Sequence, residues 1–138
     1  MPTVRRIDHI AIVVDDIEAG LGFWRDILGL EVSRVEEVAE QQAVVAMLPT
    51  GQSGIELVKP TDEESGAARF LRKRGPGMHH LCLEVDDLDG FLDRLKASGV
   101  RLITPVALTG SDGKRMAFIH PESTHGVLVE LYEIPSKA

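Results

Sequence analysis

A chain of 138 residues, 43% hydrophobic and 27% charged, is long enough for one compact domain or for two half-size modules that share a core. Its formal net charge of −7 argues against a nucleic-acid partner, because contact with phosphates needs a basic surface. The single cysteine, Cys82, excludes an internal disulfide, and the sequence shows neither a leader-like start nor a run of about 18 apolar residues. We therefore expect a cytoplasmic protein without a membrane partner.

The first predicted strand covers residues 6–14, where side chains alternate between two faces. His9, Ala11 and Val13 share one face. The opposite face carries only larger aliphatic side chains: Ile10, Ile12 and Val14. This division predicts a helix packed on the aliphatic face and an open face on the side of the histidine.

The helix after this strand is predicted to start at Asp15, which has Glu18 at the capping-box spacing, and to end at Gly29. Its apolar side chains recur at helical spacing and are assigned to the core: Ile17, Leu21, Trp24 and Leu28. Three short strands complete the first module: residues 30–36, 42–48 and 54–59, with a turn at residues 49–51.

A short helix over residues 65–74 is predicted to join the two halves and to stop at the Gly75-Pro76-Gly77 sequence. It carries four basic side chains: Arg69, Arg72, Lys73 and Arg74. These residues fit either a solvated linker helix or a contact with phosphates.

The second half repeats the first. A shift of 71 positions places His80 on His9 and the Asp86-Asp87 pair on Asp15-Asp16. The repeat predicts a strand over residues 78–85, a helix from Leu88 to Ser98-Gly99, strands over 100–104, 114–120 and 127–134, and a hairpin turn at 110–113. We expect one domain over residues 1–138, with modules at about 5–60 and 78–134 and a linker at 61–77. The predicted fold is α+β, with two tandem β-α-β-β-β modules forming a curved mixed sheet around a metal-binding cleft.

Each half supplies one histidine on its first strand and one glutamate on its last, and we predict that these four residues bind a metal ion. They are His9, Glu56, His80 and Glu130. A carboxylate between apolar neighbours is costly to bury without a partner. Two imidazoles and two carboxylates suit a divalent ion such as Co, Mn, Ni, Zn or Mg. His79 aligns with Asp8, and His120 and His125 have no counterpart in the first half, so we leave these three histidines out of the site.

The paired modules resemble the vicinal oxygen chelate superfamily and, within it, the methylmalonyl-CoA epimerase family. The resemblance covers nearly the whole chain and is carried by five segments: Ile7-Asp8-His9-Ile10-Ala11, Ile55-Glu56-Leu57 with Pro60, Gly77-Met78-His79-His80-Leu81, Ala117-Phe118-Ile119-His120-Pro121 and Gly126-Val127-Leu128-Val129-Glu130-Leu131. The metal quartet is common to the superfamily, including glyoxalase I. The double histidine and the loop after His120 are more specific to the epimerase. Some relatives carry Gln where this chain has Glu56.

The resemblance implies a metal-dependent epimerase that inverts C2 of methylmalonyl-CoA through an enolate, with cobalt as the expected ion in vitro. The small size and the acidic surface favour a homodimer. Glu130 is the expected base. Some relatives carry a second acid at the position of Val45. Glu40, Gln41 and Gln42 are polar residues nearby, and a route with a single base, or with water acting on one face, stays open.

Two segments of the second half are candidates for substrate binding. Lys114 and Arg115 follow the predicted turn, and they fit either a contact with coenzyme A phosphates or an exposed turn. The backbone amides around Ser123, Thr124 and Gly126 are candidates for holding the substrate carboxylate.

Two other functions stay open from the sequence. A glyoxalase I-like lyase or isomerase would use the same ion on a glutathione hemithioacetal. A non-catalytic protein of this fold would bind small molecules, but such proteins generally lack the four ligands, so their presence counts against that function.

Overall fold

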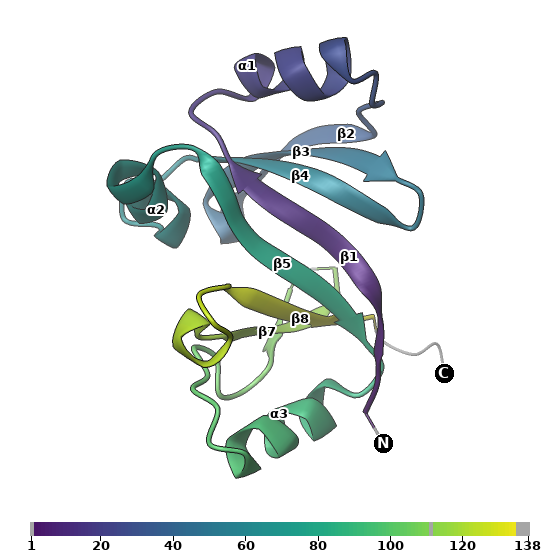
Figure 1. Ribbon diagram of the computed structural model, residues 1–138, viewed down its shortest axis with the longest axis vertical. Coiled ribbons are helices and arrows are strands. Elements are labelled where there is room, and N and C mark those ends of the chain that lie inside the picture. The colour runs from purple at the N-terminus through teal and green to yellow at the C-terminus, as the bar shows by residue number, and fades with distance from the viewer. Residues whose placement is uncertain (1, 111, 135–138) are drawn as a thin grey trace. The chain divides into compact units, whose positions relative to one another are not determined.

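The computed structural model describes residues 2–110 and 112–134, and these pack as two compact units (Figure 1). One unit is formed by residues 9–79. The other is formed by residues 80–134 together with residues 2–8 at the start of the chain. Ser111, which belongs to the predicted turn at 110–113, lies outside the described residues. Among the described residues, no helix has the length and apolar character needed to cross a membrane.

The first unit contains a four-stranded mixed sheet in the order β2-β3-β4-β1. Its elements are β1 (Val4–Val13, which begins in the other unit), α1 (Ile17–Leu21), η1 (Gly22–Ile27), β2 (Arg34–Val38), η2 (Ala39–Gln41), β3 (Ala43–Thr50), β4 (Ser53–Pro60) and α2 (Gly66–Arg74). β1 runs parallel to β4, whereas β3 is antiparallel to both of its neighbours.

The second unit contains the strands β5, β8, β7 and β6 in that order. Its elements are β5 (Gly77–Val85, which begins in the other unit), α3 (Leu88–Ala97), β6 (Leu108–Thr109), β7 (Arg115–Ile119), η3 (Pro121–Ser123) and β8 (Val129–Glu133). β5 runs parallel to β8, and β7 is antiparallel to β8 and to β6. Both units therefore have the β-α-β-β-β order with a parallel first and last strand, which confirms the predicted α+β fold and its internal repeat.

Equivalent aspartates start the first helix of each unit. Asp16 accepts a hydrogen bond from the Ala19 amide at 2.9 Å, and Asp87 accepts one from the Gly90 amide at 3.0 Å. The prediction that Asp15 caps the first helix is wrong by one residue. Asp16 still has extended backbone angles, so the helix begins only at Ile17.

The end of the first helix is wound differently from the prediction. Residues 22–27 form a π-helix instead of a continuation of the α-helix, and Gly29, with a φ of +80°, ends it as predicted. Trp24 packs against the core as expected. Leu28, however, is 53% exposed, because the wider π turn rotates it away from the apolar stripe.

Two predicted boundaries in the first unit are corrected. β2 starts at Arg34 and not at residue 30, because Leu30 and Val32 pack against the core beside α1. The turn between β3 and β4 lies at Gly51-Gln52, since Thr50 already pairs with Ser53.

The segment 100–104 forms a single bridge, between Leu102 and Ile119, in place of the predicted strand. The next residue, Pro105, has no amide hydrogen with which to continue the pairing. β6 instead pairs with β7 further along, where no strand was predicted.

The second helix of the first unit is part of its core rather than a solvated linker. Ser65 caps it, and Gly75 ends it with a φ of +78°, as predicted. Ala67, Phe70 and Leu71 pack against a cluster that includes Ala11 and Val13. α2 therefore covers part of the β1 face that carries His9, and the prediction that this face stays open is wrong.

The start of the chain is tied to the end of β5 by Asp86. The Thr3 amide donates to its carboxylate at 2.8 Å and the Thr3 hydroxyl at 2.5 Å. These bonds, the hydroxyl first, hold the pKa of Asp86 below its ordinary value of 3.8. Because the folded pKa is depressed, the stabilisation is complete above the unfolded pKa and is lost as the pH falls through the folded pKa.

We expect an Asp86→Asn variant to unfold at a lower temperature than the wild type at pH 7. The difference in Tm should shrink as the pH is lowered below 3.8, because the wild-type carboxylate then becomes protonated as well. Thermal unfolding followed by circular dichroism at several pH values tests this. A difference in Tm that stays constant down to pH 2 would show that the carboxylate charge is irrelevant to this contact.

Candidate metal centre

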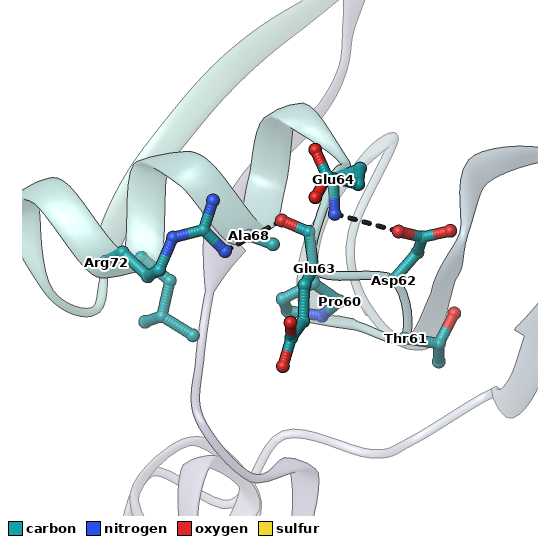
Figure 2. Close-up of a pocket in the computed structure, with 8 residues that line it drawn as sticks. Pro60, Thr61, Asp62, Glu63, Glu64, Ala68 and Arg72 are labelled. Carbon is teal, nitrogen blue, oxygen red and sulfur yellow. Dashed lines mark hydrogen bonds between the residues drawn. The ribbon is translucent and has the colours of Figure 1, made fainter.

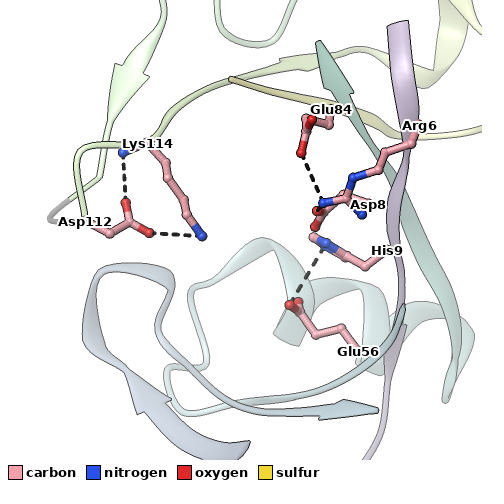
Figure 3. A network of polar contacts seen from close by, with 7 residues as sticks. All are labelled: Arg6, Asp8, His9, Glu56, Glu84, Asp112 and Lys114. Carbon is pink, nitrogen blue, oxygen red and sulfur yellow. Dashed lines mark hydrogen bonds and ion pairs between the residues drawn. The ribbon is translucent and has the colours of Figure 1, made fainter. Parts of the chain in front are cut away.

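The first unit brings one histidine and one glutamate together. His9 lies on β1 and Glu56 on the parallel strand β4, where Glu56 pairs with Ala11, two residues after the histidine. His9 Nε2 lies 3.8 Å from Glu56 Oε2, and both side chains are buried, each residue being 8% exposed (Figure 3). The parallel register thus accounts for a contact between residues that are far apart in sequence.

The second unit repeats this arrangement with His80 and Glu130. Glu130 on β8 pairs with Cys82, again two residues after the histidine of the parallel partner strand. His80 Nε2 lies 3.1 Å from Glu130 Oε1, and both residues are buried. The Phe118 ring meets the His80 ring edge-on, with the centroids 6.0 Å apart, and limits its orientation. The internal repeat therefore extends to the register of the two parallel strand pairs.

The chemistry of each pair fits a divalent ion. Imidazole nitrogen and carboxylate oxygen bind such ions at about 2.0–2.2 Å, so two ligands at right angles lie about 3 Å apart. The separation of 3.1 Å in the His80–Glu130 pair matches that value, and 3.8 Å in the His9–Glu56 pair corresponds to a wider angle. Each unit thus places one imidazole nitrogen and one carboxylate oxygen at a separation that is compatible with binding the same ion.

A second buried carboxylate lies on the same face of β5 as His80. Glu84 accepts a hydrogen bond from Arg6 Nη2 at 3.0 Å, and the same nitrogen donates to Asp8 at 2.8 Å (Figure 3). No local sequence pattern predicts this network, because Arg6 and Glu84 are 78 positions apart. Cys82, between His80 and Glu84 on this strand, is fully buried, which agrees with a packing role.

Lys114 and Arg115 lie on opposite faces of their sheet. Arg115 faces α3 and donates to both carboxylate oxygens of Asp89, at 2.8 and 3.1 Å. This contact raises the pKa of Arg115 and lowers that of Asp89. Lys114 instead holds its Nζ 5.1 Å from the ring centre of Tyr132 and 3.7 Å from Asp112.

Tyr132 is buried on the same face of β8 as Glu130. Burial raises the pKa of its phenol, while a hydrogen bond with Lys114 acts in the opposite direction. The carboxylates of Asp8 and Glu84 add smaller upward contributions to this pKa. The surroundings of Tyr132 therefore combine one cation with several buried or partly buried carboxylates.

The loop after β7 uses most of its candidate amides internally. The Gly126 amide donates to Pro121 O at 2.8 Å, and the Thr124 amide donates to the same oxygen at 3.2 Å. The Ser123 hydroxyl accepts from the Arg101 amide at 2.9 Å. A substrate carboxylate held by this loop would have to replace these bonds, so that role stays a prediction.

The position at which some relatives carry a second acid is apolar in this chain. Val45 is buried in the cluster beneath α2. Directly opposite it, the edge strand β2 places Glu36, whose carboxylate lies 3.2 Å from Arg34 Nε. Gln42 is turned toward the loop before α2 and donates to Asp62 at 3.0 Å. Glu36 is thus a candidate acid that the sequence analysis missed, since it depends on the register between β2 and β3.

A cavity of about 430 Å³ lies beside α2, and none of the predicted ligands is among the residues that line it (Figure 2). It is lined by Pro60, Thr61, Asp62, Glu63, Glu64, Ala68, Leu71 and Arg72. Arg72 donates to the Glu63 carbonyl at 2.7 Å, and Arg69 donates to the Glu64 carbonyl at 3.0 Å. Two of the basic side chains considered for phosphate contact therefore hold the preceding loop, and the carboxylates beside them disfavour an anion.

Comparison with known proteins places these features in a family. Residues 8–118 match the Glyoxalase/Bleomycin resistance protein/Dioxygenase superfamily. The chain is 38% identical over 127 residues to the mitochondrial methylmalonyl-CoA epimerase of Mus musculus. This match covers 91% of this chain and 71% of the mouse protein. It is 36% identical to the ethylmalonyl-CoA/methylmalonyl-CoA epimerase of Cereibacter sphaeroides, over 95% of this chain and 99% of that protein.

Among solved structures, a methylmalonyl-CoA epimerase in complex with methylmalonyl-CoA and NH4+ superposes with a TM-score of 0.87. Its sequence is 36% identical, and the match covers 97% of both chains.

Proposed function

The chain belongs to the methylmalonyl-CoA epimerase family of the Glyoxalase/Bleomycin resistance protein/Dioxygenase superfamily, and from this premise we propose that it inverts C2 of methylmalonyl-CoA. The observation that carries the proposal is the repeated buried His–Glu pair, which has the same strand register in both units. The acyl-CoA substrate follows from the relatives, which are named for that reaction.

We propose that the two pairs together bind one divalent ion, with His9, Glu56, His80 and Glu130 as its ligands. Each pair supplies one imidazole nitrogen and one carboxylate oxygen. When bound, the ion neutralises the negative charge that develops on the thioester oxygen, and such stabilisation is worth roughly 3–4 kcal/mol. Cobalt is the proposed ion in vitro, because a mixed imidazole and carboxylate set suits a borderline divalent ion.

Glu130 is the proposed base that removes the C2 proton. Its carboxylate is buried, so the acceptor for the proton stands in a site with little water. Transfer to a positioned carboxylate typically contributes about 10²–10⁴ in rate. Inversion also needs a proton returned to the opposite face of C2. Water is one candidate donor, and Glu36, which lies opposite Val45 in the pairing of β2 with β3, is another.

A single exchange experiment tests this function. In heavy water, we expect the C2 proton of methylmalonyl-CoA to exchange for deuterium when the protein is loaded with cobalt. We expect the exchange to stop after EDTA treatment and to resume when cobalt is added again. Proton NMR of the methyl signal, which loses its coupling to C2–H, measures the rate. Activity with methylglyoxal and glutathione in place of this exchange would contradict the proposal and favour the glyoxalase I-like alternative.

We further propose a homodimer in the cytoplasm. Three apolar side chains at the end of the first helix are exposed, namely Phe23, Ile27 and Leu28, and a second copy of the chain could cover them. The reduced, buried Cys82 is consistent with a reducing compartment.

A further inference from the structure

The orientation of Lys114 bears on which part of the substrate it meets. In the antiparallel pair of β7 and β8, Met116 lies opposite Tyr132 and Phe118 lies opposite Glu130, and opposite residues share a face. Lys114 precedes Met116 by two residues, so it lies on this face as well. Its contact with the Tyr132 ring agrees with that assignment. Lys114 therefore shares a face with a predicted metal ligand, whereas Arg115 points toward α3.

The spacing of residues along β8 indicates how far the Tyr132 ring lies from Glu130. Successive residues on one face of a strand are about 6.6 Å apart, so the ring beneath the ammonium group lies one such spacing from Glu130. The free carboxylate of a methylmalonyl group is bonded directly to C2, the atom that Glu130 is proposed to deprotonate. The phosphates of coenzyme A are separated from C2 by the whole pantetheine arm. The Lys114 ammonium lies over the ring of Tyr132, two residues from Glu130 on the same strand face, and this position suits the carboxylate better than the phosphates.

The charges on this face lead to the same conclusion. Glu84 and Glu130 are both buried there, so an entering carboxylate needs a positive partner in addition to any bound ion. Arg6 already donates to Asp8 and Glu84. The Lys114 ammonium is 3.7 Å from Asp112, whose side chain is 55% exposed, so a substrate carboxylate competes there with a solvated partner.

We infer that Lys114 binds the free carboxylate of the acyl group and thereby selects a malonyl-type thioester over a simple acyl thioester. This inference rests on the proposed function. It replaces the sequence-based alternatives for Lys114, a contact with coenzyme A phosphates or an exposed turn.

Binding measurements on the cobalt-loaded and the EDTA-treated protein test the inference. Isothermal titration calorimetry would compare methylmalonyl-CoA, propionyl-CoA, which lacks the carboxylate, and coenzyme A itself. For Lys114→Met we expect affinity for methylmalonyl-CoA to fall by about 10-fold or more, while propionyl-CoA and coenzyme A change by less than about twofold. Lys114→Arg should retain most of the preference. The control is Lys96→Met, which removes an exposed lysine on α3 of the same unit and should change nothing.

The outcomes separate this inference from the proposed function. If Lys114→Met bound all three coenzyme A compounds more weakly by the same factor, Lys114 would contact the phosphates that they share. That result would overturn the inference. An unchanged preference for methylmalonyl-CoA would overturn it too. If the wild type itself binds propionyl-CoA as tightly as methylmalonyl-CoA and shows no exchange at C2, the proposed function fails before Lys114 is considered.

Discussion

A His80→Ala variant is expected to bind Co²⁺ at least about 100-fold more weakly than the wild type and to lose nearly all exchange at C2. The side chain is buried with its Nε2 3.1 Å from Glu130, so its removal takes away one proposed ligand and the contact that orients another. Loss of a group that only orients a ligand typically costs 10–100-fold in metal affinity, and loss of a ligand itself should exceed that range. Calorimetric titration with Co²⁺ and the exchange assay measure both effects.

The neighbouring histidine provides the matched control. His79 packs edge-on against Phe70, with ring centroids 5.2 Å apart, and lies on the other face of β5 from His80. His79→Ala should therefore leave Co²⁺ affinity within about threefold of the wild type, a small change beside the loss of a ligand. Because His80→Ala also removes a packed ring, His80→Gln, which fills more of the space, should show the same loss of metal. Equal Co²⁺ affinity in the His79 and His80 variants would remove His80 from the ligand set.

The internal repeat made most of this site predictable from sequence. The offset that aligns His9 with His80 also aligns the aspartates that cap the two helices, and it implies two similar modules. Parallel pairing of the first and last strand of each module then brings each histidine beside a glutamate. Local pattern was sufficient here, because a two-residue period on a strand fixes which face a side chain occupies.

Contacts that depend on register or on distant partners were not predictable in the same way. The turn that precedes Lys114 and Arg115 suggested a common role, yet adjacent strand residues point to opposite faces, and only Arg115 reaches Asp89. No local signal connects Arg6 with Glu84. The helix from Gly66 resembled a solvated linker, since four of its nine residues are basic. Three of its apolar residues, Ala67, Phe70 and Leu71, nevertheless pack against the core cluster and dock the helix there.

The π-helical turn at residues 22–27 shows a further limit of sequence patterns. The apolar residues from Ile17 to Leu28 fit an α-helical stripe, and the pattern itself contains no sign of a change in winding. Within this turn, Trp24 packs against the cluster that contains Leu21 and Leu48. The change leaves Phe23, Ile27 and Leu28 exposed, a consequence that affects the surface and not the His–Glu pairs.

The two glutamates allow the roles of metal ligand and base to be separated. Glu56 and Glu130 occupy equivalent places in the repeat, each opposite the residue two positions after a histidine, and each is 8% exposed. Glutamine keeps an oxygen that can bind an ion but cannot accept the proton. We therefore expect Glu130→Gln to lower kcat by about 10²–10⁴, the usual contribution of a general base. Glu56→Gln should retain activity within about tenfold, because its role is ligation alone.

Metal affinity distinguishes this interpretation from simple loss of the ion. The two variants should lose a similar, modest amount of Co²⁺ affinity, since each replaces one carboxylate by a neutral oxygen ligand. At saturating Co²⁺, the difference in C2 exchange between them then reports the base. Equal rates for the two variants under those conditions would mean that Glu130 only binds metal, and the search for the base would move to other groups such as Glu36. If only Glu130→Gln exchanges the C2 proton slowly, Glu130 is both a metal ligand and the base. Glu56, its equivalent in the other unit, is then a metal ligand alone.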